Sequence, residues 1–233
     1  MKSSLRNMVI ALFAITAVSA LLVAVVNDAT KEAIELSQQQ AEEEAKFKAL
    51  RISSDKARVL RDTTRVISDF EVTVSTIANK AGDSIVGYAV KAPSITKNGY
   101  GGRITLMVGF KELDGEAVVD SVVVLSQKET PGLGANMEKK DNSLICSVLG
   151  KSASSLKFSV TKEGGSFDAL TGSTISSRAY ANAVETAYAG YLWAKGALDL
   201  STEAVAAAPT GASKPNMEQK NESEAQEGEQ DNE

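Results

Sequence analysis

A turn rich in hydroxyl groups, with an acid ahead of it, is the stretch of this sequence best suited to chemistry. This hydroxyl turn, residues 168–174, reads Asp-Ala-Leu-Thr-Gly-Ser-Thr. Apolar residues then recur at three- and four-residue steps over about 176–198, which predicts a long helix. The first N–H groups of a helix lack partners and carry partial positive charge, so such an end suits a phosphate. The simpler interpretation is that Ser173 or Thr174 only caps the helix.

Composition narrows the chemistry that this turn could serve. The chain has 233 residues, a net charge of −5 and no basic patch with interleaved aromatics, so nucleic-acid binding is not expected. It has no histidine, which removes Ser-His-Asp catalysis and most zinc or haem sites. Its one cysteine, Cys146, is expected to be a small apolar residue on a helix. Redox chemistry would therefore need a bound organic cofactor.

A second candidate segment, the Pro-Gly loop of residues 129–135, follows a valine-rich stretch and reads Glu-Thr-Pro-Gly-Leu-Gly-Ala. Proline fixes one backbone angle, and Gly132 and Gly134 permit left-handed or close-approach geometry. Such a loop can lie flat against a planar ring, with Leu133 as an apolar contact and backbone N–H groups as donors. An ordinary tight turn is the alternative.

The amino end reads as a membrane anchor. Residues 8–26 form an apolar run that, as a helix, spans about 28 Å and matches a bilayer core. Lys2 and Arg6 precede the run and Asp28 follows it, which places residues 1–7 in the cytoplasm and the rest on the far side. A cleaved signal peptide is the competing interpretation, but the apolar run continues past the small residues at 18–20, so an uncleaved anchor is favoured.

The remaining chain predicts an α+β domain with a largely antiparallel sheet flanked by helices. Residues 27–64 form a stalk, helical from 29 to about 60 because Ala, Glu, Gln and Lys are good helix formers. The domain occupies 65–200, with a hairpin turn at Asp114 and Gly115 and a short helix at 142–149. An acidic tail at 201–233 is predicted to be disordered. Strands are expected at about 70–74, 84–90, 102–110, 117–127 and 157–160.

Together these segments resemble a known family over about residues 1–198, everything except the tail. Residues 129–134 are similar to its ETPGLG loop, and residues 168–174 to its D-x-x-(S/T)-G-A-T flavinylation motif. Tyr100, Gly101, Gly102, Arg103 and Ile104 resemble its glycine-rich entry to a central strand. The family is the FMN-binding domain of bacterial ion-translocating redox complexes. Its members include the G subunit of the Rnf electron transport complex and the C subunit of the sodium-translocating NADH:quinone reductase.

The resemblance implies a covalent flavin. It makes Thr174 the residue joined to the FMN phosphate, and Asp168 the acid needed by the modifying enzyme, a flavin transferase that uses FAD and a divalent metal. Self-attachment is not expected, because a threonine hydroxyl is a weak nucleophile and the chain has no histidine to activate it. The turn that presents Thr174 would be formed by Thr171, Gly172 and Ser173. The neighbours of the flavin ring would be Thr130, Gly132, Leu133 and Gly134.

Two positions depart from the family pattern. Ser173 stands where the family usually has alanine, so the turn should survive but gains a competing hydroxyl. Gln127 and Lys128 occupy the place where a histidine often precedes the loop, so no role is carried over to them.

The function that the resemblance implies is electron transfer by covalent FMN in a membrane-bound, ion-translocating ferredoxin:NAD⁺ oxidoreductase of the Rnf type. Its partners would be other membrane subunits, the flavin transferase and the lipid bilayer through residues 8–26. The domain would lie on the outer, periplasmic side of the cytoplasmic membrane. The alternative is the C subunit of the sodium-translocating NADH:quinone reductase, which shares the motifs. A different class is a non-redox anchored structural or binding domain.

Overall fold

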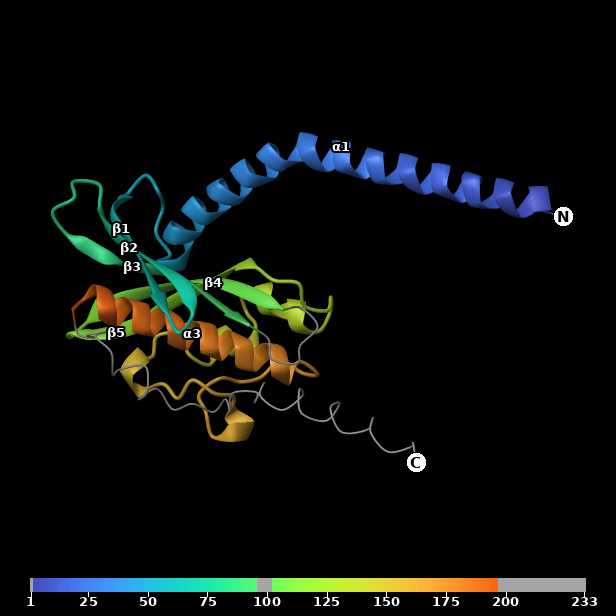
Figure 1. The fold of residues 1–233 in the computed structure, drawn as a ribbon. Helices are drawn as coiled ribbons and strands as arrows, with labels where there is room; N and C mark the ends of the chain where they lie inside the picture. Colours follow the sequence, from blue (N-terminus) through green and yellow to red (C-terminus); the bar gives the residue numbers. More distant parts are fainter. Residues whose placement is uncertain (1, 96–101, 197–233) are drawn as a thin grey trace, which may run out of the picture. The chain divides into compact units, whose positions relative to one another are not determined.

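The computed structural model describes residues 2–95 and 102–196, so the acidic tail, Tyr100 and Gly101 lie outside the described residues. The main elements follow one another as one helix, five strands and a helix (Figure 1). They are α1 (Lys2–Ala49), β1 (Ala57–Ile67), β2 (Phe70–Asn79), β3 (Ile85–Ile95), β4 (Arg103–Leu113), β5 (Glu116–Ser126) and α3 (Thr174–Ala194). Between β5 and α3 lie α2 (Ser143–Cys146) and three short 3₁₀ turns, Gly134–Glu138, Ala153–Ser155 and Thr161–Glu163.

The strands form an antiparallel meander in the order β1-β2-β3-β4-β5. The predicted turn between β4 and β5 is confirmed, because Asp114 and Gly115 there have φ values of 53° and 82°. Two consecutive positive φ values suit a two-residue hairpin, since they match the right-handed twist of the strands. The expected α+β class with an antiparallel sheet is therefore confirmed.

Helix α3 packs along one face of this sheet (Figure 1). The approach is close at Gly190, where an added Cβ would lie 2.7 Å from Cγ1 of Val72 in β2. Aromatic rings fill the same layer, with Tyr191 of α3 5.2 Å from Tyr88 and 5.4 Å from Phe110 between ring centroids. This contact fixes the direction of α3, and so the place of its first turn.

The last turns of α1 pack on the opposite face of the sheet. Ala45, Ala49 and Leu50 are buried there in one cluster with apolar side chains of the sheet, including Ile77 and Met107. Residues 5–41 of the same helix are exposed. That exposed part contains a stretch long and apolar enough to cross a membrane, as the sequence predicts.

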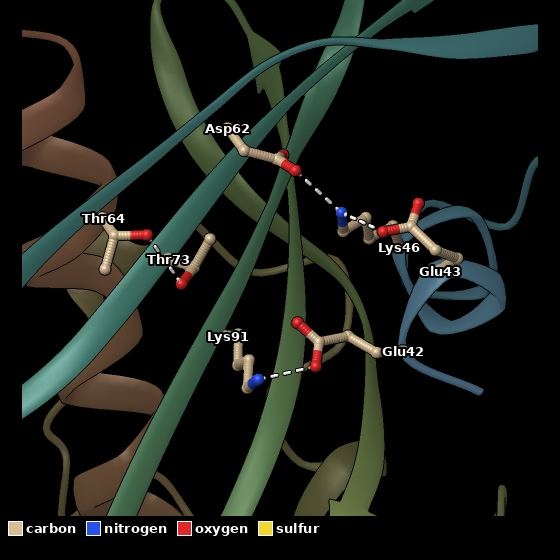
Figure 2. A network of polar contacts seen from close by, with 7 residues as sticks. All are labelled: Glu42, Glu43, Lys46, Asp62, Thr64, Thr73 and Lys91. Carbon is tan, nitrogen blue, oxygen red and sulfur yellow. Dashed lines mark hydrogen bonds and ion pairs between the residues drawn. The ribbon is translucent and has the colours of Figure 1, made fainter. Parts of the chain in front are cut away.

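Ion pairs reinforce the contact between α1 and the sheet (Figure 2). Lys46 is 3% exposed and donates hydrogen bonds to Glu43 at 2.6 Å and to Asp62 of β1 at 2.9 Å. Lys91 of β3 donates to Glu42 at 2.6 Å. Burial acts to lower the pKa of Lys46, but its bonds to the two carboxylates outweigh burial and raise that pKa. Burial likewise acts to raise the pKa of Asp62, but hydrogen bonds from neighbouring donors, Lys46 among them, outweigh it and lower that pKa.

Two local predictions are wrong, and a third is confirmed. The stalk helix ends at Ala49 instead of about residue 60, and the sheet begins with β1 at Ala57. Residues 157–160 form no strand, because only Val160 makes a bridge, to Phe167. Cys146 lies on a helix, as expected, and it is exposed at the end of α2.

Candidate functional site

The hydroxyl turn leads into α3 without a side-chain cap. Ser173 occupies the N-cap position with φ −134° and ψ 45°, and its side chain makes no capping hydrogen bond. Ser177 holds the turn instead, because its Oγ accepts the Leu170 N–H at 3.0 Å and donates to the Ser173 carbonyl at 2.8 Å. Gly172 between them has φ +73°. Ser173 is therefore the N-cap residue by position but does not cap α3 through its side chain, and it offers the first N–H groups of the helix no side-chain acceptor.

The hydroxyls of the turn differ in their access to solvent. Thr174, the first residue of α3, is half-buried and Thr171 is exposed. Ser173 is only 7% exposed and Ser176 only 5%. Thr174 and Thr171 can therefore be reached by another molecule, whereas Ser173, the position that departs from the family pattern, is closed off.

The Pro-Gly loop has the geometry that its glycines predict. The Thr130 carbonyl accepts N–H groups of Leu133 at 3.1 Å and Ala135 at 3.2 Å. Gly132 is left-handed, with φ +78°, and an added Cβ there would have open space within 4 Å. Gly134 is a close-approach position, since a Cβ there would lie 2.8 Å from Cβ of Glu129. Gly132 therefore presents open backbone to solvent, and Gly134 lets the loop fold back on its own first residue.

The turn and the loop meet in space. Leu133 of the loop packs on Gly172, where a Cβ would lie 3.3 Å from Leu133 Cδ2. Behind this contact, Ser176 Oγ donates to Glu129 Oε2 at 2.8 Å in a buried hydrogen bond. The fold thus joins two motifs that are separated in the sequence by the whole segment between Ala135 and Asp168.

An open pocket of about 450 Å³ lies at this junction. Three predicted site residues line it, namely Gly132, Leu133 and Thr171. The other predicted residues lie outside its lining: Thr130, Gly134, Asp168, Gly172, Ser173 and Thr174. The sequence does not predict the remaining lining residues: Asn136, Lys139, Asp141, Asn142, Ser143 and Leu170.

One of these missed residues has a signal in the sequence. Asn142 precedes a short apolar helix, a position where Asn commonly caps, and its side chain accepts the Ile145 N–H at 3.0 Å. The same side chain donates to the carbonyls of Met137 at 2.8 Å and Lys139 at 2.6 Å. Asn142 therefore shapes the polar wall of the pocket. Nothing in the sequence pattern marks Lys139 or Asp141 as its neighbours in the site.

Asp168 stands apart from the pocket. It is exposed, and its backbone N–H donates to Ser147 Oγ at 3.1 Å. Within residues 2–95 and 102–196, its carboxylate makes no hydrogen bond or ion pair. The acid of the motif is thus exposed and does not line the pocket.

The two motifs that meet in this fold fall within one known protein domain. Residues 99–189 match the family model of the FMN-binding domain. They contain both the Pro-Gly loop and the hydroxyl turn.

Curated relatives narrow this class further. The chain is 40% identical over 104 residues to the ion-translocating oxidoreductase complex G subunit of Aliivibrio fischeri strain MJ11, covering 43% of this chain and 47% of the relative. It thus spans about half the length of that relative. The same-named protein of Shewanella oneidensis is 32% identical over 194 residues, covering 78% of this chain and 86% of the relative. The chain therefore belongs to the family of G subunits of ion-translocating oxidoreductase complexes, and it carries an FMN-binding domain.

The residues present fit FMN. A pocket of about 450 Å³ lies within the range of about 300–1,000 Å³ typical of cofactor sites. Open backbone at Gly132 and the exposed side chain of Leu133 offer a flat wall for a ring. The uncapped start of α3 offers N–H groups to a phosphate. A surface suited to a ring and a helix end suited to a phosphate thus belong to one junction.

Proposed function

We propose that this protein transfers electrons in a membrane-bound, ion-translocating oxidoreductase complex of the Rnf type, through FMN joined by a phosphoester to Thr174. The observation that carries the proposal is the contact of the hydroxyl turn with the Pro-Gly loop beside one open pocket. When bound, FMN supplies one- and two-electron transfer. The protein's own task is to hold the cofactor and set its surroundings, and no acid or base of the chain is needed for that.

Thr174 is the best acceptor among the hydroxyls of the turn. Ser173 is buried, and Ser176 and Ser177 are buried and already hydrogen-bonded. Thr174 is half-buried and begins α3, so a phosphate on its Oγ would lie next to the unpaired N–H groups. Placing an anion at such a helix end contributes about 0.3–1 kcal/mol when exposed and up to about 2 kcal/mol when partly buried. Thr171 is the competing exposed hydroxyl.

The ring would lie in the pocket against Leu133 and Gly132. Leu133 is 45% exposed, and it lines the pocket, so a ring bound there would cover an apolar surface that now faces solvent. Thr171 and Asn136 line the same space and can supply hydrogen bonds to the polar edge of a flavin. Leu133 is therefore assigned the apolar contact with the ring.

Attachment requires a second enzyme. The bond formed joins Thr174 Oγ to the phosphorus of the FMN half of FAD, the pyrophosphate bond breaks, AMP leaves and the hydroxyl proton is released. The sequence has no histidine that could take this proton. The exposed carboxylate of Asp168 is open for recognition by the flavin transferase.

The setting of the site is a membrane. The exposed apolar part of α1 and the membership in this family indicate a single-pass membrane protein. Lys2 and Arg6 ahead of the apolar run favour a cytoplasmic amino end and a domain on the outer side. There, a covalent bond keeps the cofactor from being lost by dissociation. The partners are the other membrane subunits of the complex.

The C subunit of the sodium-translocating NADH:quinone reductase shares the motifs. The Rnf-type G subunit is preferred because the matched relatives are named G subunits of ion-translocating oxidoreductase complexes. The distinguishing observation is which set of membrane subunits copurifies with the chain. A non-redox anchored domain, the third class, predicts no attached flavin at all.

The experiment is co-expression with the flavin transferase, followed by a denaturing gel under ultraviolet light and intact-mass analysis. The wild type should give a fluorescent band and a mass increase of one FMN less one water. Thr174→Val should lose both, because the acceptor hydroxyl becomes a methyl of similar size. Peptide mapping of the loaded wild type should place the added mass on Thr174 and not on Thr171, the other exposed hydroxyl. A fluorescent band that persists in Thr174→Val would refute the assignment, and a dark wild type would refute covalent FMN.

A further inference from the structure

Glu129, the first residue of the Pro-Gly loop, is 7% exposed and lies where the loop and α3 meet. Its backbone N–H donates to Gln127 Oε1 at 2.5 Å, and Gln127 Nε2 donates to Glu138 Oε1 at 2.8 Å. The start of the loop is thereby tied to the segment that follows it. A carboxylate is rarely buried unless it is hydrogen-bonded, so the bonds it makes there are informative.

The side chain of Glu129 acts on the first turn of α3 through Ser176. Ser176 Oγ donates to Glu129 Oε2 at 2.8 Å, and Ser176 is 5% exposed. The contact is tight, because an added Cβ at Gly134 would lie 2.7 Å from Ser176 Oγ and 3.1 Å from Glu129 Oε2. Only a glycine at 134 leaves room for this hydrogen bond.

Helix geometry carries the constraint from Ser176 to Thr174. Successive residues of an α-helix are rotated by about 100°, so residues two apart point in nearly opposite directions, about 200° around the axis. With Ser176 held inward by Glu129, Thr174 is turned outward, in keeping with its half-buried state. The hydrogen bond that holds Ser176 inward thus also sets the direction of the Thr174 side chain.

We propose that Glu129 is a positioning residue for flavin attachment, which acts through its hydrogen bond to Ser176 to turn the Thr174 hydroxyl outward and to hold the Pro-Gly loop against the start of α3. This inference rests on the proposed function. It assigns Glu129 no contact with the cofactor. What it requires at position 129 is a hydrogen-bond acceptor, because the Ser176 hydroxyl is a neutral donor that an uncharged carbonyl oxygen can also satisfy.

The test measures the initial rate at which purified flavin transferase, with FAD and Mg²⁺, attaches flavin to the full-length chain in detergent. Glu129→Ala and Ser176→Ala should each slow attachment by at least about tenfold, equivalent to about 1.4 kcal/mol. The double variant should be no slower than the slower single one, because both changes remove the same interaction. Glu129→Gln, whose amide oxygen can still accept from Ser176, should restore at least half of the wild-type rate. Glu71→Ala, which removes an exposed acid of β2 that makes no hydrogen bond or ion pair among the described residues, is the control and should match the wild type.

A second measurement needs no flavin. Amide hydrogen exchange of the first turn of α3 in the unloaded chain should be faster in Glu129→Ala and Ser176→Ala than in the wild type and Glu71→Ala. Fluorescence of the only tryptophan, Trp193, which lies at the far end of α3, checks that each variant is folded.

The outcomes separate this inference from the proposed function. A wild type that accepts no flavin refutes the proposed function. A wild type that accepts it at Thr174, with folded Glu129→Ala and Ser176→Ala variants at unchanged rates, refutes the positioning role alone. A Glu129→Gln variant as slow as Glu129→Ala would overturn the hydrogen-bond mechanism in favour of charge. Additive effects in the double variant would overturn the claim that the two residues act together.

Discussion

Gly134→Ala should damage the junction of the loop and the turn although it adds only one methyl group. The new Cβ would lie 2.7 Å from Ser176 Oγ, about 0.7 Å short of ordinary van der Waals contact at 3.4 Å, and 2.8 Å from Glu129 Cβ. Overpacking of this kind costs about 1–3 kcal/mol. If Ser176 moves away, its hydrogen bond to the carboxylate is lost at a further cost of about 1.5–3 kcal/mol. The free energy of unfolding should therefore fall by about 2.5–6 kcal/mol.

The assay is thermal unfolding of the full chain in detergent, followed by Trp193 fluorescence. In a domain of this size, each kcal/mol corresponds to about 2–4 °C, so the midpoint should fall by about 5–24 °C. Gly132→Ala is the matched control in the same loop. Its φ of +78° gives a left-handed cost of about 1–2 kcal/mol, but the new Cβ would have open space within 4 Å. Gly134→Ala should lower the unfolding midpoint more than Gly132→Ala does. If the midpoint of Gly134→Ala is equal to or above that of Gly132→Ala, the reasoning is refuted.

Two further predictions concern the ring contact and the packing of α1. Leu133→Asp should shift the redox potential or absorption spectrum of the flavin without preventing its attachment, because Leu133 lines the pocket and Thr174 does not. A Leu133→Asp variant that fails to attach flavin would contradict the assignment of the ring contact to the loop and of the attachment to the turn. The pKa of Asp62 is lower in the folded protein than its unfolded value of about 3.9, so the carboxylate stabilises the fold above that value. This stability is lost as the pH falls through the folded pKa. In urea unfolding, acidification from about pH 5 to pH 3 should therefore destabilise the wild type more than Asp62→Asn. Equal pH dependence in the two proteins would show that the Lys46–Asp62 pair contributes nothing measurable.

The sequence predicts those parts of the fold that local pattern controls. Strands β2 to β5 alternate or are dense in valine, and Asp114 with Gly115 marks a hairpin, so pattern and turn chemistry agree. Strand β1 escapes prediction because it is an exposed edge strand with Arg58, Arg61 and Arg65 along it, and it lacks a clear apolar alternation. Residues 157–160 have a strand-like pattern, but the fold gives them only one bridge.

The same division holds for the site. The proposed acceptor Thr174 and the loop residues Gly132 and Leu133 can be predicted because their motifs are continuous in the chain. The hydrogen bond between Glu129 and Ser176 cannot, because it joins residues 47 positions apart and depends on how β5 and α3 are placed. Buried Ser173 shows the same limit, since its hydroxyl competes with Thr174 on sequence grounds and the fold closes it off.

The meander order of the sheet has a consequence for how the protein folds. Each strand pairs with its neighbour in the chain, so the sheet is made of local contacts, which form early. Helix α3 depends on distant ones, such as the bonds from Ser94 to Asn182 at 2.8 Å and from Tyr191 to Glu112 at 2.7 Å. Because closing such long loops is slow, we expect the helix that carries Thr174 to dock after the sheet has formed. An enzyme that recognises the docked turn would then modify only chains that have completed folding, so attached flavin would indicate a fully folded chain.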